Sequence, residues 1–269
     1  MRYCRIQTPH GPRFAELALR SGELWVERIL PPFEEEVFGT LREQRTVAAS
    51  DPRFEPCPIS GAKLLAPVVP SKIVCVGRNY REHAAELGNE VPAEPLLFFK
   101  PPSSLLAPEG TIVLPNFSER VDFEGELALV IGVRCAKVGE SEDVRQYIRG
   151  YTIVNDVSAR DLQKKDGQWA RAKGCDTFCP AGPIVTDEID PVHGVGVRTR
   201  LNGNLLQDGN TRDFIFPIDF LLRYISAAMT LYPGDLISTG TPAGVAAMHA
   251  GDRVEVSVEG IGTLANTVA

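Results

Sequence analysis

One apolar segment with two acidic residues at its start constrains this chain more than any other feature. Residues 121–131 read VDFEGELALVI, and the apolar second half is typical of a buried β-strand. Glu124 and Glu126 are two residues apart, so alternation along a strand turns both carboxylates to one face. Two like charges entering a core repel each other and are costly to desolvate. The pattern therefore calls for a compensating cation, and a divalent metal ion is the natural candidate.

A second β-type segment carries a third acidic residue. Residues 151–158 read YTIVNDVS and place Asp156 at the end of the run. Glu124, Glu126 and Asp156 together predict an all-oxygen site that suits Mg²⁺ or Mn²⁺, with Ca²⁺ as a substitute. Three protein ligands leave positions for water and substrate. The alternative is that the two glutamates form the solvated face of an edge strand and bind no metal.

Composition narrows the class of protein. A chain of 269 residues with 43% hydrophobic residues can bury a sizeable core. Its net charge of -7 provides no basic field for nucleic acid or an anionic membrane. No apolar run approaches the roughly 20 residues of a membrane helix, and the N-terminus lacks a secretion signal. We expect a cytoplasmic protein with no nucleic-acid or membrane partner and with reduced cysteines.

Turn signals divide the chain near residue 68. Strands at 2–7, 14–19 and 23–28 and a helix near 34–44 predict a small N-terminal α/β domain with a proline-marked linker, residues 1–68. Residues 69–269 contain β-type runs at 73–77, 96–99, 111–114, 123–133, 151–157, 183–186, 195–201, 236–239 and 253–258. Helices are expected at 79–87, 141–148 and 217–229. Because strands and helices do not alternate regularly, we expect an α+β fold of packed sheets.

A short predicted helix offers a pair of residues for acid–base chemistry. Residues 77–88 read GRNYREHAAELG, and His83 and Glu86 share a face at a spacing of three. A carboxylate beside an imidazole orients the ring and raises its basicity. This dyad can activate a water molecule. The alternative is an ordinary pair on a helix surface.

Two lysines and a glycine-rich turn offer groups for binding an anion. Lys100 ends an apolar strand, and Lys173 lies among small and aromatic residues in WARAKG. Either cation can hold a carboxylate or a developing enolate, or can simply be solvated. In the turn STGTPAG, residues 238–244, backbone N–H groups and the Thr241 hydroxyl can bind a carboxylate or carbonyl. Arg160 and Gln163 follow Asp156 and lie either near a bound ligand or on a helix surface.

The motifs in this order resemble the fumarylacetoacetate hydrolase family. They are GRNYxxHxxE, FxKP, DxExE, NDxSARD, KxxDTF and TGTPxG, and they span roughly residues 70–269. The resemblance is strongest to small bacterial members that act as 2-hydroxyhepta-2,4-diene-1,7-dioate or 5-carboxymethyl-2-hydroxymuconate isomerases. It implies layered mixed β-sheets around a metal ion, and a homodimer.

The resemblance also implies roles for individual positions. The expected ligands of Mg²⁺ or Mn²⁺ are Glu124, Glu126 and Asp156. The expected catalytic residues are His83 and Glu86, as the acid–base dyad, and Lys173, which stabilises the enolate. The expected substrate contacts are Arg78, Asn79, Lys100, Gln163 and Thr241. Residues 77–79 offer no further carboxylate ligand, unlike the hydrolases that give the family its name.

The implied activity is metal-dependent chemistry on 2-oxo or 2-hydroxy-dienoic dicarboxylic acids, in the degradation of aromatic compounds. From a shared enolate, protonation at another carbon gives an isomerase, and loss of a β-carboxylate gives a decarboxylase. We expect one of these two activities, with acylpyruvate hydrolysis or oxaloacetate decarboxylation as alternatives. A non-catalytic, metal-stabilised binding module is the alternative of another class. The dyad of His83 and Glu86 favours an enzyme, because a structural metal site needs no acid–base pair.

Overall fold

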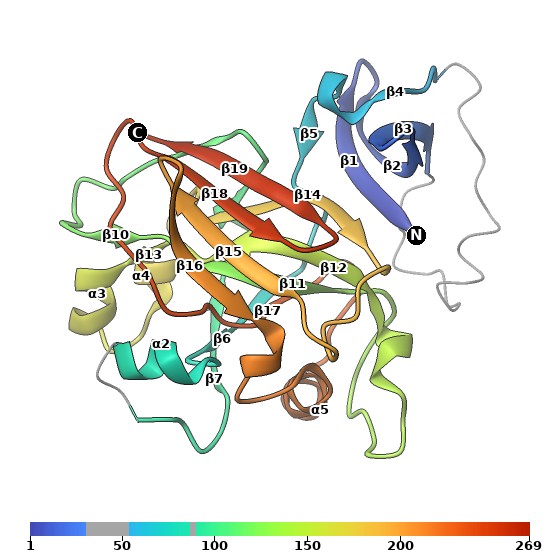
Figure 1. Cartoon of the computed structure of the whole chain (residues 1–269). Coiled ribbons are helices and arrows are strands. Elements are labelled where there is room, and N and C mark those ends of the chain that lie inside the picture. Colours follow the sequence, from blue (N-terminus) through green and yellow to red (C-terminus); the bar gives the residue numbers. More distant parts are fainter. Residues whose placement is uncertain (31–53, 87–89) are drawn as a thin grey trace.

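The computed structural model describes residues 1–30, 54–86 and 90–269. These residues form mixed β-sheets and a few short helices (Figure 1). The larger sheet has 12 strands, of which ten follow the order β4-β3-β2-β1-β14-β12-β11-β17-β6-β7, with β5 beside β1 and β8 beside β14. Its strands are β1 (Arg2–Thr8), β2 (Gly11–Arg20), β3 (Glu23–Ile29), β4 (Cys57–Pro58), β5 (Leu64–Leu65), β6 (Ile73–Gly77), β7 (Leu96–Lys100), β8 (Leu105–Leu106), β11 (Gly125–Ile131), β12 (Ile148–Asn155), β14 (Cys179–Thr186) and β17 (Leu236–Ser238).

A second sheet packs against the first. Its order is β16-β15-β18-β19-β9, and β10 pairs separately with β13. These strands are β9 (Thr111–Ile112), β10 (Val121–Asp122), β13 (Ser158–Ala159), β15 (Gly196–Leu201), β16 (Asn204–Asn210), β18 (Arg253–Val258) and β19 (Gly262–Val268). The α-helices are α2 (Arg81–Glu86), α3 (Arg160–Lys165), α4 (Ala170–Lys173) and α5 (Ile218–Ala228), and the 3-10 helices are η1 (Ile59–Gly61), η2 (Pro102–Ser104), η3 (Val144–Tyr147) and η4 (Thr211–Asp213). The expected α+β class is confirmed.

Strand β11 lies in the middle of the larger sheet, between β12 and β17. Leu127 and Leu129 face the second sheet and share a core cluster with Val256 of β18. On the opposite face, Ala128 and Val130 belong to another apolar cluster. Every residue of β11 is buried. The alternative that Glu124 and Glu126 form the solvated face of an edge strand is therefore wrong.

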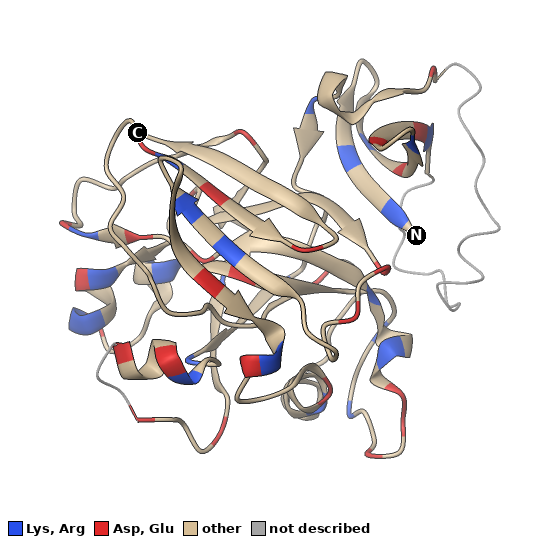
Figure 2. Ribbon diagram, in the orientation of Figure 1, with Lys and Arg blue, Asp and Glu red and all other residues tan. Residues whose placement is uncertain are grey.

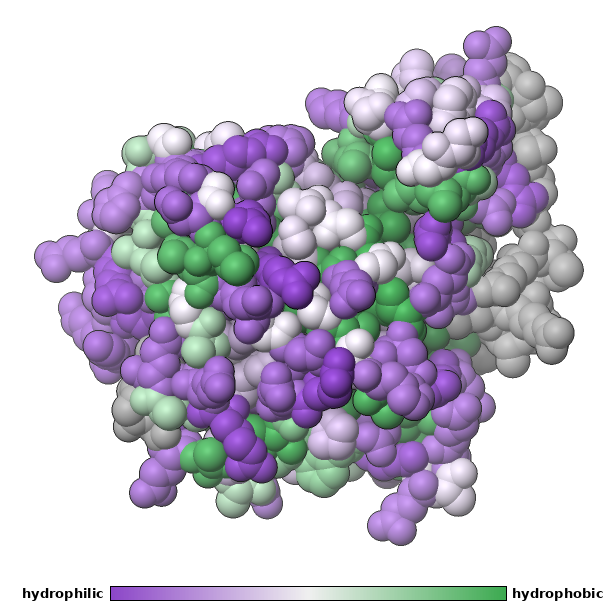
Figure 3. All heavy atoms as spheres, in the orientation of Figure 1, coloured by the Kyte–Doolittle hydropathy of each residue, from purple (hydrophilic) through white to green (hydrophobic). Residues whose placement is uncertain are grey.

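The N-terminal strands continue the larger sheet. Arg2 and Tyr3 of β1 pair with Thr186 and Val185 of β14. The proposed domain boundary near residue 68 stays a prediction, and the helix expected at 34–44 lies outside the described residues. In the space-filling view, hydrophilic side chains cover most of the visible face, with smaller apolar areas between them (Figure 3). Across the described ranges, no helix combines the length and apolar character that crossing a membrane requires.

Most expected strands are present, but one expected helix is wrong. The segment 141–148 forms only the 3-10 turn η3, and Ile148 already begins β12. Pairing of β12 with β11 over seven residue pairs outweighs the local helical pattern. The helix expected at 217–229 is confirmed as α5, with Pro217 at its N-cap. The short helices α3 and α4 and the strand β19 were not predicted.

Asp235 ties the start of β17 to the start of its parallel neighbour β6. The carboxylate is fully buried and accepts hydrogen bonds from Ser71 N and Oγ, Lys72 N and Nζ, and Tyr232 N, at 2.6–3.1 Å. The two strands pair from Leu236 and Ile73 onward. Five donors around one buried carboxylate make this contact a strong anchor, because removing the acceptor leaves backbone N–H groups without partners.

We expect Asp235→Ala to lower the free energy of unfolding by about 3–5 kcal/mol, because it leaves Lys72 and several N–H groups unpaired. Each kcal/mol lowers the Tm by about 2–4 °C in a chain of this size. The control is Asp208→Ala, since Asp208 is exposed on β16 and pairs with exposed Arg198. Figure 2 shows that basic and acidic residues alternate with uncharged ones along β15 and β16. The control is expected to change stability by less than about 1 kcal/mol. Equal Tm values for the two variants in thermal unfolding would contradict the anchor.

Candidate metal centre and active site

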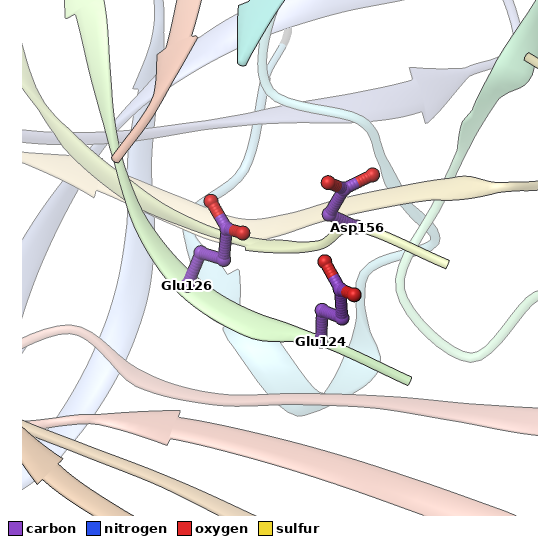
Figure 4. A group of neighbouring side chains, drawn as sticks. All are labelled: Glu124, Glu126 and Asp156. Carbon is purple, nitrogen blue, oxygen red and sulfur yellow. The ribbon is translucent and has the colours of Figure 1, made fainter. Parts of the chain in front are cut away.

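Three buried carboxylates come together at the start of β11 (Figure 4). One oxygen from each of Glu124, Glu126 and Asp156 can be chosen so that all lie within 4.8 Å of one another. The register explains the third member: Gly125 pairs with Asn155, and the N–H of Asp156 donates to the carbonyl of Glu124 at 2.8 Å. Asp156 therefore stands opposite Glu124 on the neighbouring strand. The predicted grouping of these residues is present.

The last residue of β17 and the turn that follows it support this cluster through alternate residues. Ser238 Oγ and Gly240 N donate to Oε2 of Glu126 at 2.6 and 2.8 Å. The hydroxyls of Thr239 and Thr241 donate to the carbonyls of residues 127 and 125 at 2.7 and 2.9 Å. Successive side chains of an extended chain point to opposite sides. The turn thus fixes the side chain of Glu126 with one set of residues and the backbone of β11 with the other.

Three basic residues compensate the buried negative charges. Lys173 Nζ donates to Glu124 Oε2 at 2.8 Å and to Asp156 Oδ2 at 2.7 Å. Lys100 Nζ donates to Asp156 Oδ1 at 2.6 Å, and Arg160 Nη2 donates to Glu124 Oε1 at 2.6 Å. Since each carboxylate oxygen has two lone-pair directions, these bonds orient Glu124 and Asp156 and still leave a lone pair on each oxygen for an ion.

The predicted dyad faces the same space. His83 Nδ1 and Glu86 Oε2 are 3.2 Å apart on α2, and His83 is 4% exposed. Glu86 also accepts from the N–H of Gly244 at 3.0 Å, which connects α2 to the turn after β17. With Nδ1 paired to Glu86, Nε2 is the nitrogen left for exchange of a proton with another molecule. The alternative of a simple surface pair does not fit the burial of His83.

A cavity of about 520 Å³ unites most of the predicted residues. The predicted residues that line it are Arg78, His83, Glu86, Glu124, Glu126, Asp156, Gln163, Lys173 and Thr241. Phe98, Trp169 and Val76 add apolar wall, and Arg120, Arg160 and Lys164 add positive charge. Because carboxylates, cations and an imidazole converge in one hollow, this cavity is the candidate active site.

Three expected substrate contacts have partners inside the protein. Asn79 is fully buried, outside the cavity lining, and bonds Phe216 N and the carbonyls of Phe216 and Thr239. Lys100 is also outside the lining and holds Asp156 from behind. The Thr241 hydroxyl proton goes to the carbonyl of Gly125. The polar groups of these three side chains are used in hydrogen bonds within the protein, and these bonds hold the segments around the cavity together.

Arg78 reaches the cavity from a left-handed backbone conformation, with φ 57°. For a residue with a side chain, this conformation costs roughly 1–2 kcal/mol. It bends the chain between β6 and α2 so that Asn79 enters the core while Arg78 lines the cavity. Strain of this kind is typical of functional sites.

Residues 72–269 match the family model described as fumarylacetoacetate (FAA) hydrolase C-terminal. The chain belongs to the fumarylacetoacetate hydrolase family. It superposes with a TM-score of 0.84 on the structure of 2-hydroxyhepta-2,4-diene-1,7-dioate isomerase from Mycobacterium marinum, at 42% identity, covering 100% of this chain and 98% of that one.

Two further family members differ in reported chemistry. Mitochondrial oxaloacetate tautomerase FAHD2B of Bos taurus is 37% identical over 293 residues, which cover 100% of this chain and 91% of the relative. Fumarylpyruvate hydrolase from Pseudomonas aeruginosa, solved in complex with Mn²⁺ and pyruvate, has a TM-score of 0.70 at 28% identity, covering 77% of this chain and 91% of that one. The family therefore contains enzymes that catalyse different reactions.

In this family member, burial and neighbouring charges set the protonation of the cluster. Burial first, and then the charges of Asp156 and Glu124, raise the pKa of Glu126 well above its ordinary value. Burial also acts to raise the pKa of Glu124, but Lys173 and Arg160 outweigh it and lower the pKa overall. Burial acts to lower the pKa of Lys173, and the charges of Asp156 and Glu124 outweigh it and raise the pKa. Lys173 stays charged, and Glu126 is the carboxylate that lacks a cation.

The residues fit a divalent ion. Two oxygens that each lie about 2.0–2.6 Å from one ion are at most about 5 Å apart, which agrees with the 4.8 Å limit of the cluster. All hydrogen bonds that the described residues donate to Glu126 use Oε2, so Oε1 is available as a ligand. An all-carboxylate donor set favours Mg²⁺ or Mn²⁺ over softer metals. The buried triad is therefore the candidate divalent-metal site.

Sequence reasoning left Arg160 open between a place near a bound ligand and a helix surface, and it did not single out Asp122 or Arg120. Arg160 is 4% exposed, and its guanidinium bonds Asp122 Oδ2 at 2.9 Å and Gln163 Oε1 at 2.7 Å besides Glu124. Arg120 bonds the same Asp122 from the cavity rim at 2.9 Å. The available signal was sequence spacing from the predicted ligands. Asp122 lies two residues before Glu124, and Arg160 lies four residues after Asp156.

We expect Glu126→Gln to lose Mn²⁺ binding and to stabilise the metal-free protein. A carboxyl whose pKa is raised in the folded state stabilises the fold below its unfolded pKa and loses that contribution as the pH rises through the folded pKa. Glutamine is never ionised, so the variant avoids this loss above the ordinary carboxyl pKa. Thermal unfolding in a metal chelator at rising pH, and calorimetric titration with Mn²⁺, measure the two effects.

Glu109→Gln is the matched control, because Glu109 is 66% exposed and pairs with exposed Arg253. It is expected to leave Mn²⁺ affinity and metal-free stability unchanged. Wild-type Mn²⁺ affinity in Glu126→Gln would contradict the ligand assignment of Glu126. A lower Tm without metal would contradict the raised pKa of its carboxyl.

Proposed function

We propose that this protein is a divalent-metal-dependent isomerase that moves a proton within 2-oxo or 2-hydroxy-dienoic dicarboxylic acids through an enolate. Isomerisation of 2-hydroxyhepta-2,4-diene-1,7-dioate is the leading activity. One observation carries the proposal: the His83–Glu86 dyad and the Lys173 ammonium line the same cavity as the acidic triad. Similarity along the whole chain to the isomerase from Mycobacterium marinum supports the substrate class.

The roles of the residues follow from their contacts. Glu124, Glu126 and Asp156 would hold Mg²⁺ or Mn²⁺, which when bound would supply Lewis-acid polarisation of the 2-oxo group. Lys173 uses two of its three N–H donors on Glu124 and Asp156, and the third is available for the oxygen on which enolate charge develops. Its charge is held close to the reacting oxygen before reaction begins.

Proton transfer falls to the dyad. Nε2 of neutral His83 accepts a proton from one carbon or hydroxyl of the substrate and returns it to another carbon, so the substrate keeps its atoms and the histidine is regenerated. The Glu86 carboxylate at Nδ1 stabilises the imidazolium formed between the two transfers. The apolar walls from Phe98 and Trp169 limit access of water to the enolate.

Two cations on the cavity wall suit a substrate with a second carboxylate. Arg78 and Lys164 line the cavity, and neither forms an ion pair within the described part of the chain. Arg160, by contrast, is engaged by Asp122 and Glu124. Unpaired cations in a hollow attract an additional anionic group. This charge distribution supports a dicarboxylic acid over a substrate with a neutral tail.

Oxaloacetate is the second candidate substrate. The tautomerase of Bos taurus supports it, because keto–enol exchange needs the same dyad and the same enolate stabilisation. Decarboxylation of oxaloacetate, acylpyruvate hydrolysis and a non-catalytic binding module are the other outcomes. A cytoplasmic homodimer is part of the proposal, and sedimentation of the purified protein tests the dimer.

We expect metal-stripped protein to regain activity on the diene dioate when Mn²⁺ or Mg²⁺ is added. The assay compares this substrate with oxaloacetate and an acylpyruvate, and follows ultraviolet absorbance and product mass. An isomer has the mass of its substrate, a decarboxylated product lacks CO₂, and hydrolysis adds water. Turnover of oxaloacetate alone would replace the leading substrate. Metal binding without turnover of any of the three would remove support for the isomerase.

We expect His83→Ala to lower kcat by about 10²–10⁴-fold and to leave Mn²⁺ affinity near that of the wild type, because the imidazole transfers protons and is not a ligand. His193→Ala is the matched control, since His193 pairs with Asp190 at the same spacing of three but is 81% exposed. A pure KM effect in His83→Ala, measured under saturating metal, would make His83 a substrate contact instead.

A further inference from the structure

Gln207 is a buried amide on a strand that is otherwise turned to solvent. It lies on β16, the edge strand of the second sheet, and has no exposed surface. Its neighbour Leu206 is 39% exposed and Leu205 is 42% exposed. A fully buried glutamine costs free energy unless its polar atoms are bonded. The contacts of this side chain therefore show what it holds.

All contacts of the Gln207 amide go to the segments that carry the acidic triad and the turn after β17. Oε1 accepts from the backbone N–H of Gly125 at 3.0 Å. Nε2 donates to Thr241 Oγ1 at 2.7 Å and to the carbonyl of Pro242 at 2.8 Å. The orientation of the amide is fixed, because a flip would set its NH₂ group against the N–H of Gly125.

Gly125 is the residue between the two ligand glutamates, so its peptide position sets both of them. Strand β17 pairs with β11 only at residues 128–130, and the N–H of Gly125 lies beyond that ladder. Gln207 supplies the acceptor at this point. On the other side of the amide, Thr241 follows Gly240, whose N–H holds Glu126. One side chain thus joins the backbone of the triad to the turn that orients it.

Close packing leaves these segments little freedom around Gln207. A Cβ at Gly125 would lie 2.2 Å from Thr199 Oγ1 and 3.2 Å from Gln207 Oε1. A Cβ at Gly244 would lie 1.9 Å from the carbonyl oxygen of Leu206. Gly125 is needed because Thr199 of β15 and Val256 of β18 approach its backbone, and Gly244 is needed because β16 does. The segments that the Gln207 amide joins are therefore closely packed on both sides of it.

We propose that Gln207 is a positioning residue of the metal centre, which holds Glu124, Glu126 and the turn at residues 239–244 in their binding geometry without touching substrate. The amide lies outside the cavity lining. The inference rests on the ligand assignment made under the proposed function. Bonds that orient metal ligands change metal affinity by about 10–100-fold when they are removed.

The test is calorimetric titration of Gln207→Met with Mn²⁺, together with kcat and KM at saturating Mn²⁺. Methionine has similar length and no amide, so we expect the Kd for Mn²⁺ to rise by about 10–100-fold, with KM changed less than kcat. Thr241→Val and the double variant of Gln207→Met with Thr241→Val complete a double-mutant cycle for Mn²⁺ affinity. Since Gln207 acts partly through Thr241, the double variant is expected to lose less affinity than the two single losses combined.

Leu205→Ser is the control on the same strand and is expected to bind Mn²⁺ as the wild type does. If Gln207→Met folds with a lower Tm but keeps the wild-type Kd for Mn²⁺ and the wild-type kcat, Gln207 contributes only to stability. That result would overturn the proposal. If Gln207→Met does not fold, Gln207→Glu, which keeps the acceptor for Gly125, is measured by the same criteria. Wild-type protein that binds no Mn²⁺ overturns this inference, whereas binding without turnover overturns only the proposed function.

Discussion

Three carboxylates buried side by side impose the constraint on which the rest of this structure depends. Glu124 and Asp156 each accept a bond from the Lys173 ammonium, and Lys100 and Arg160 bond their remaining oxygens. Glu126 has hydroxyl and backbone donors but no cation, so its charge is the one left for a metal ion. The layers behind the triad exist because charge brought into a core must be matched by donors of fixed geometry.

The two sheets make different contributions to this arrangement. The larger sheet sets the spacing of the acidic side chains, because register places Asp156 opposite Glu124. The second sheet contributes no ligand, yet Gln207 from its edge strand reaches the backbone between the glutamates. The turn after β17 connects the triad to α2 through Glu86. The acidic triad and the His83–Glu86 pair therefore belong to one hydrogen-bonded unit.

Sequence patterns identified the residues whose charge has no ordinary place in a core. Glu124, Glu126 and Asp156 could be grouped because alternation and strand ends limit where their side chains point. Asn79 and Lys100 were expected to contact the substrate, and in the structure both hold neighbouring segments and lie outside the cavity lining. Gln207 gave no signal, because a glutamine on a hairpin strand becomes informative only when its hydrogen-bond partners are known.

Sequence alone determined the α+β class from the order of its elements, and it determined the pairs Glu124–Glu126 and His83–Glu86 from periodicity over a few neighbouring residues. Asp156 could be named from its place at a strand end, but the register of β11 and β12 brings it to the two glutamates. Tertiary structure decided what surrounds them. Strand order placed β11 in the centre of the sheet, and where a helix was expected at 141–148 the chain forms only the 3-10 turn η3 before β12 begins at Ile148. Which cation meets which carboxylate depends on contacts between residues 17–56 positions apart. Local propensity cannot encode such contacts, because they form only when separate strands are packed together.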